Sequence, residues 1–224
     1  ASPVISQWTN NLHGLEAVGN SFNLFFGLMV MFISLILGAL YMINNIGSEK
    51  LCKSLRKCLA EYFGCFLVIF LYVVVELLTM DGYAVNQDGS VYMESGKYLN
   101  NFLEMPVVLA LFLIGALLFV AGVALTLKNL TFKKGIWLAG PGIVMAVMAL
   151  FMIAGYNGTA YYPSTADIQC SLSLSNSCSS EFTLKTMAIV SLIIPFVVAY
   201  IAYFWRQMDK KSLTKEELET GEKY

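Results

Sequence analysis

Long apolar runs and short polar segments alternate along this chain. Five of the runs contain few charged residues, and each is long enough to form a membrane-spanning helix. About 20 helical residues cross a hydrocarbon core of roughly 30 Å, because a helix rises about 1.5 Å per residue. The pattern predicts five spans, at residues 22–43, 60–79, 104–127, 136–154 and 183–205.

Polar segments flank this predicted membrane domain, which covers residues 22–205. Residues 1–21 form a mixed N-terminal segment, and residues 206–224 form a charged tail. Of all residues, 58% are hydrophobic and 13% are charged, and the mean hydropathy is +0.68. A soluble domain of this size could not cover so much apolar surface. We therefore expect an all-α fold, a polytopic transmembrane helix bundle with five spans.

Lysine and arginine are distributed unevenly among the polar segments. All 14 of them except Lys97 and Lys185 fall in residues 44–59, in residues 128–135 or in the C-terminal tail. Basic residues concentrate on the cytoplasmic side of membrane proteins. The expected topology is therefore multi-pass, with the N-terminal end outside and the C-terminus in the cytoplasm. The segment between the last two spans is then an outer loop.

Charge and cysteine content narrow the expected partners and cofactors. The net charge of −1 provides no basic patch, so we expect the lipid bilayer and no nucleic acid as a partner. One histidine, His13, and five scattered cysteines do not make a tetrahedral metal site. Cys170 and Cys178 lie in the predicted outer loop, where an oxidising compartment permits a disulfide. Their spacing alone does not show that the two sulfurs meet.

Two carboxylates near the outer end of the second span are candidate site residues. Glu76 lies inside the apolar run, where an ionisable group is costly and is by default a hypothesis for a proton relay. A position this close to water also allows its side chain to reach out of the membrane. Asp81 begins an Asp-Gly step, which is a turn signal in its own right. Both are therefore proton-relay or structural carboxylates, and we assign no catalytic residue and no metal ligand.

Small residues and a proline mark the fourth and fifth spans. Gly142, Ala146 and Ala149 form a stripe that lets another helix approach closely. Pro195 lies inside the fifth span, where its missing backbone donor predicts a kink.

Several short motifs occur in the order and with the spacing of one known family. Over essentially its whole length the chain resembles subunit II of cytochrome bd-type quinol oxidases. The matching segments are Leu12–Ala17, Gly38–Tyr41, Asn44–Asn45, Asp81–Tyr83, Met93–Glu94, Lys97–Leu99, Met105–Pro106, Gly155–Tyr162 and, most clearly, residues 163–187.

The resemblance implies an activity and a set of partners. The family couples oxidation of a membrane quinol to reduction of O2 to water in the bacterial cytoplasmic (inner) membrane. Subunit I binds haems b and d and the quinol. Subunit II resembles it in fold but is haem-free, supports its partner and in some members holds a structural quinone. The chain would then be a non-catalytic subunit of a membrane quinol oxidase.

The resemblance also implies an arrangement of helices. Subunit II of the family has nine spans, four in a first bundle and the others in a second bundle with one peripheral helix. This chain resembles the last five. We therefore expect a four-helix bundle plus a peripheral helix, with a first bundle missing from this sequence. We expect contact with subunit I through small-residue faces such as the one on the fourth span.

Two other interpretations stay open. In a small secondary transporter, Glu76 and Pro195 would mark a substrate or proton path, although no convincing inverted repeat relates the halves of the chain. The chain could also be a structural subunit of another respiratory membrane complex, without a redox group.

Overall fold

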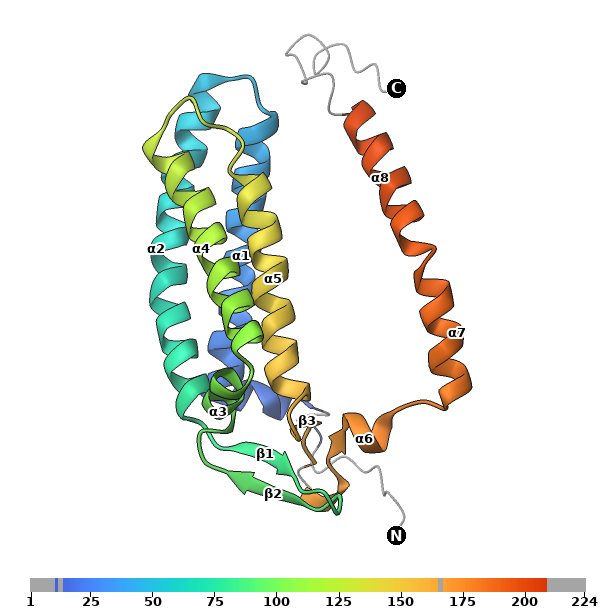
Figure 1. Ribbon diagram of the computed structural model, residues 1–224. Coiled ribbons are helices and arrows are strands. Elements are labelled where there is room, and N and C mark those ends of the chain that lie inside the picture. The colour runs from blue at the N-terminus through green and yellow to red at the C-terminus, as the bar shows by residue number, and fades with distance from the viewer. Residues whose placement is uncertain (1–10, 12–13, 165–166, 209–224) are drawn as a thin grey trace.

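The computed structural model describes residues 11, 14–164 and 167–208 and is dominated by long helices (Figure 1). Five helical segments of this part of the chain are long and apolar enough to cross a membrane, which confirms the predicted all-α five-span fold. They are α1 (Ser21–Asn45), α2 (Glu49–Thr79), α4 (Pro106–Lys128), α5 (Ile136–Gly155), and a last segment in two pieces, α7 (Glu181–Ser191) and α8 (Ile194–Met208).

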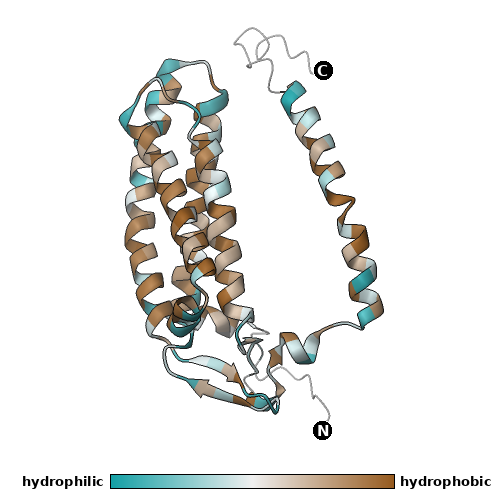
Figure 2. Cartoon of the chain, viewed as in Figure 1, coloured by the Kyte–Doolittle hydropathy of each residue, from teal (hydrophilic) through white to brown (hydrophobic). Residues whose placement is uncertain are grey.

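The four helices α1, α2, α4 and α5 form an up-and-down bundle, and α7–α8 stands beside it (Figure 1). Large apolar side chains remain exposed on every long helix, as expected of a surface that meets lipid instead of water. Hydrophilic residues gather at the two ends of the bundle and hydrophobic ones lie between them (Figure 2). The segments 1–10 and 209–224 of the predicted N-terminal region and tail, together with His13, lie outside the described residues.

Helices α4 and α5 pack more closely than any ordinary side chain would allow. A Cβ atom on Gly142 would lie 2.7 Å from the carbonyl oxygen of Gly115, and one on Gly122 would lie 2.7 Å from that of Gly135. Ala149 on the same stripe is fully buried. The expectation that this stripe faces a partner subunit is therefore wrong, because α4 already occupies it.

Two apolar clusters hold the bundle together along its length. In the half near the α1–α2 turn, the fully buried Ile36, Leu40 and Leu59 are joined by Phe66 and Phe119, whose rings meet edge to face at 5.2 Å. In the other half, further apolar side chains of α4 and α5 pack against α3 (Lys97–Glu104). The short helix α3 thus closes one end of the bundle.

The fifth helical segment is broken where Pro195 predicts it. The backbone N–H groups of Leu192 and Ile193 donate to the carbonyls of Ile189 and Val190, which tightens the turn, and α8 restarts at Ile194. Proline has no N–H and its ring obstructs the preceding turn, so a continuous helix is disfavoured here. A single hydrogen bond, from Trp205 to the Tyr41 hydroxyl at 3.5 Å, links α8 to the bundle among the described residues.

The segments expected to be outer loops contain small sheets. Strands β1 (Gly82–Val85) and β2 (Val91–Glu94) form an antiparallel hairpin in which Tyr83 pairs with Met93. Strands β3 (Ala160–Tyr162) and β4 (Leu172–Ser173) form a second pair, and a bridge between Ala84 and Thr159 joins the two. The short elements η1 (Leu15–Gly19), η2 (Ile168–Cys170) and α6 (Leu174–Ser177) complete this region. We call it the hairpin end.

The opposite end of the bundle, here the basic end, is closed by one arginine. The Arg56 guanidinium is buried and donates to the carbonyls of Asn129, Leu130 and Phe132 at 3.1, 3.0 and 3.1 Å. Lys133 donates to the carbonyl of Ile46 at 3.1 Å. The α4–α5 turn is thus tied to both α1 and α2.

Candidate functional site

Glu76 and Asp81, the two carboxylates singled out by the sequence, both lie at the hairpin end of α2. Glu76 is half-buried in the last turn of the helix, and its backbone carbonyl accepts from Met80 N–H at 2.8 Å. Asp81 follows the helix and is exposed. Within the described residues, no hydrogen bond or ion pair engages either carboxylate, so both remain free to meet a ligand or a proton.

A buried amide organises the hairpin end. Asn101 is fully buried on α3, and its Nδ2 donates to the carbonyl of Ile153 at 2.7 Å and to the Thr159 hydroxyl at 2.8 Å. Its Oδ1 accepts from the Asn157 amide at 3.0 Å, and that amide also donates to the Glu104 carboxylate. One side chain thereby ties α3 to the end of α5 and to the loop beyond it. The sequence pattern did not single out Asn101, because a polar residue between spans looks exposed.

Replacing Asn101 by leucine is expected to lower the free energy of unfolding by about 2 kcal/mol, because Thr159 and Ile153 lose their buried partner. Thermal unfolding of the protein purified in mild detergent measures this effect. The matched control is Asn100→Leu, since the neighbouring amide is only half-buried and donates to Glu94 at 3.0 Å. Equal shifts of the thermal unfolding midpoint in the two variants would contradict the organising role of Asn101.

An ion pair stabilises the connection between the hairpin and α3. Lys97 is buried, and its ammonium lies 3.1 Å from the Glu94 carboxylate. The hydrogen bond from the Asn100 amide has the largest effect and holds the pKa of Glu94 below its usual value. Burial opposes this effect, and Lys97 adds to the lowering. The Glu94 carboxylate therefore contributes to stability above its unfolded-state pKa, and this contribution is lost as pH falls through its folded-state pKa.

A deep apolar cleft of about 530 Å3 lies within the bundle, in the half nearest the hairpin end. All four helices line it, and every lining side chain is apolar except Tyr98 of α3. Burial and, to a lesser degree, the neighbouring Tyr83 raise the pKa of Tyr98. The apolar lining suits a hydrocarbon chain, and Tyr98 is the one side chain on the wall that carries a hydrogen-bonding group. Like Asn101, Tyr98 was not singled out from the sequence.

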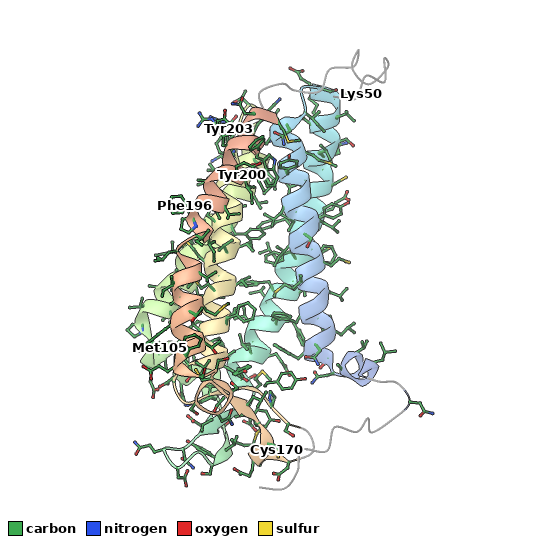
Figure 3. The ribbon with its side chains drawn as sticks, turned by 90° about the vertical axis from the view of Figure 1, so that its right-hand side faces the viewer. Lys50, Met105, Cys170, Phe196, Tyr200 and Tyr203 are labelled. Carbon is green, nitrogen blue, oxygen red and sulfur yellow. The ribbon has the colours of Figure 1, made fainter. Side chains whose placement is uncertain are left out.

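The two loop cysteines lie on either side of β4 and α6. Cys170 ends η2 and Cys178 follows α6, and both are exposed free thiols in the structure (Figure 3 labels Cys170). The predicted disulfide is therefore not formed here and stays a prediction. Among the described residues, no cluster of His, Cys, Asp and Glu could hold a metal ion.

The long apolar helices, polar ends and lipid-facing surface define a multi-pass α-helical membrane protein. The model of the family "Cytochrome bd terminal oxidase subunit II" matches residues 3–208, which is most of the sequence. The chain belongs to this family.

Similarity to individual proteins points the same way. The chain is 28% identical over 149 residues to cytochrome bd-I ubiquinol oxidase subunit 2 of Escherichia coli strain K12. The same identity and length hold for the corresponding protein of strain O157:H7. Each match covers 63% of this chain and 37% of the relative. The chain thus aligns with well under half the length of these relatives.

Proposed function

We propose that this chain acts as part of the haem-free subunit II of a bd-type quinol:oxygen oxidoreductase in the bacterial cytoplasmic membrane. The observation that carries the proposal is the family match, which includes all five helical segments. In this role the chain supports a haem-bearing subunit I during quinol oxidation and O2 reduction to water. Haems b and d belong to the partner, and this chain contributes no catalytic residue.

The proposed orientation places the hairpin end outside and the basic end in the cytoplasm. Lys50, Lys53, Lys57 and Lys128 lie at the basic end, close to the Arg56 closure. Cytoplasmic loops are enriched in such residues. The N-terminal end of the described chain is then outside, and α8 ends at the cytoplasmic surface. The quinol, and any structural quinone, are partners of the whole assembly and are not assigned to a site in this chain.

Affinity purification of the native protein through a tag on this chain tests the proposed function. The expected result is co-purification of a larger membrane subunit with haem absorbance, together with quinol-dependent O2 uptake. A colourless protein with transport activity would favour a secondary transporter. A colourless protein within another respiratory complex would favour a structural subunit of that complex. Either of these results would overturn the proposal.

Glu76 is proposed to assist proton movement at the hairpin end. Its carboxylate is half-buried near the end of a span and engages no other described residue, and an ionisable group in such a place is a candidate for a proton path. Glu76→Gln is expected to slow quinol-driven O2 uptake of the purified complex by about threefold or more, while haem content stays unchanged. Glu61→Gln, an exposed change on α2 farther from the hairpin end, is the matched control. Equal O2 uptake in the two variants would leave Glu76 as a structural carboxylate.

The disulfide between Cys170 and Cys178 is proposed for the mature protein outside the cytoplasm. Protein isolated with its free thiols blocked during lysis is expected to gain about 2 Da when it is then reduced. The reason is that a disulfide forms with loss of one hydrogen atom from each of its two thiols. The peptides that contain the two cysteines should be linked before reduction and separate after it. Full alkylation of both residues without reduction would show that they remain free thiols.

A further inference from the structure

The apolar cleft opens sideways at the surface of the bundle. Phe26 and Val30 of α1 and Val147 and Phe151 of α5 line it and are also exposed, so it opens between these two helices. The exposed Leu67 of α2 and Val120 of α4 also line it, so it opens on that side as well. Figure 3 views this side of the molecule, with α1 on the right of α5. In a cleft of about 530 Å3, Tyr98 is the one polar side chain on the wall, and an ordered water needs two to four polar partners. Inside a membrane, an apolar group therefore fills it.

The length of the cleft matches one leaflet of a bilayer. Its α1 wall runs from Phe22 to Ile33, which corresponds to about 16 Å along the helix axis. Half of a typical hydrocarbon core is about 15 Å thick. The cleft therefore extends from the hairpin end to about the middle of the membrane, which is the depth that one acyl chain reaches.

The lining discriminates between an acyl chain and the ring of a quinone. A quinone head brings two carbonyl oxygens, and the cleft offers one hydroxyl, that of Tyr98. A buried carbonyl without a donor costs about 1–3 kcal/mol. An acyl chain carries no polar atom into the cleft, and its ester group would remain at the end where Tyr98 lies. The cleft is thus better suited to an acyl chain.

Charges at the rim select the headgroup. Leu77 and Met80 line the cleft at the end of α2, and the carboxylates of Glu76 and Asp81 are their neighbours in the chain. Among the described residues of the hairpin end the one cation is Lys97, which is paired with Glu94 at 3.1 Å. Lys185, at the start of α7, forms an exposed pair with Glu181 at 2.7 Å. Within the part of this end that the structure describes, an anionic headgroup therefore finds free carboxylates and no free cation. A headgroup with an exposed ammonium is complementary to this rim.

We propose that the cleft binds one acyl chain of an ethanolamine-type zwitterionic phospholipid from the leaflet at the hairpin end, with its ammonium facing Glu76 and Asp81. The bound chain completes the packing between α1 and α5. It acts as a structural lipid of the bundle. This site does not depend on the redox role proposed above, because it rests on the cleft and its rim alone.

Photolabelling of the wild-type complex in lipid nanodiscs tests the proposal directly. The probes are phosphatidylethanolamine and phosphatidylglycerol, each with a diazirine in one acyl chain, and labelled residues are located by peptide mass spectrometry. The ethanolamine probe is expected to label residues 22–33 and 143–154 at least threefold more than the exposed face of α4. The glycerol probe is expected to label them less. Equal labelling of all lipid-facing surfaces would overturn the proposal.

Two pairs of variants separate the cleft from its rim. Ala116 lines the cleft from α4, whereas Ala110 on the same helix is exposed and lies outside it. Ala116→Phe should reduce labelling at least threefold, and Ala110→Phe should not. At the rim, Glu76→Gln should reduce the preference for ethanolamine over glycerol about threefold, as for loss of one surface charge pair, and Glu61→Gln should leave it unchanged.

Competition with a quinone tests the other possible occupant of the cleft. Nanodiscs are prepared with and without an isoprenoid quinone of the host membrane. If added quinone suppresses labelling of residues 22–33 by the ethanolamine probe, the cleft is a quinone site and the proposal is wrong. If the Ala116→Phe protein does not accumulate, the wild-type labelling pattern and the quinone competition still decide the question.

Discussion

Gly142→Leu is expected to prevent stable assembly of the α4–α5 pair. A Cβ atom at this position would lie 2.7 Å from both the Gly115 carbonyl oxygen and the Phe119 nitrogen, and backbone atoms cannot move aside without separating the helices. Overpacking typically costs about 1–3 kcal/mol, and a clash with backbone belongs at or above the upper end of this range. The expected result is a loss of most folded protein, measured as the monodisperse fraction in detergent-solubilised membranes.

Gly140→Leu is the matched control for this prediction. Gly140 lies on the same helix, two residues away, and a Cβ atom there would meet nothing within 4 Å. The same leucine should therefore be tolerated and should leave the thermal unfolding midpoint within a few degrees of the wild type, since surface changes cost about 0.5 kcal/mol or less. Similar losses in both variants would show that helix propensity, and not close packing, sets the requirement for glycine.

Arg56→Met is expected to lower the free energy of unfolding by about 3 kcal/mol, because hydrogen bonds to a charged donor contribute about 1.5–3 kcal/mol each and water can replace part of the loss. Three carbonyl groups of the α4–α5 turn would lose their shared donor. Methionine keeps most of the apolar length of the side chain, so the change mainly removes the guanidinium. Denaturant titration of the purified protein, monitored by tryptophan fluorescence, measures the effect.

Two further variants define the origin of this effect. Lys53→Met removes a neighbouring charge that is exposed on the same helix, and it should change stability by about 0.5 kcal/mol or less. Arg56→Lys should recover only part of the loss, because an ammonium cannot reproduce the planar fork that reaches three carbonyls. Full recovery by lysine would contradict the role given to the fork geometry.

The sequence predicted the membrane spans more successfully than the structure of the segments that connect them. Apolar runs predict helices in a membrane because every backbone polar group there must be satisfied within the segment. The hairpin end is different, since polar residues in water can form a loop, a strand or a short helix. The β1–β2 hairpin depends on pairing across a turn, and β3–β4 and the bridge to Thr159 depend on contacts that are distant in sequence.

Some candidate site residues could be found from the sequence, and others only from the structure. Glu76 could be singled out from the sequence because a carboxylate within an apolar run is unusual. Tyr98 and Asn101 could not, because their burial results from α3 folding back onto α5. Small residues at helical spacing correctly indicated a close helix contact, but not its partner. The stripe that includes Gly142 packs against α4 of the same chain.

The sequence by itself determined the all-α class, five long helices, the break near Pro195 and the family. Each of these follows from local composition, spacing or short motifs, which a single chain segment carries. Only the tertiary structure decided which helices touch, where the apolar cleft lies and which polar groups become buried. Those properties depend on how separate segments meet in space: α1, α2, α4 and α5 leave the cleft between them, while Arg56 and Asn101 each tie together parts of the chain more than 50 residues apart.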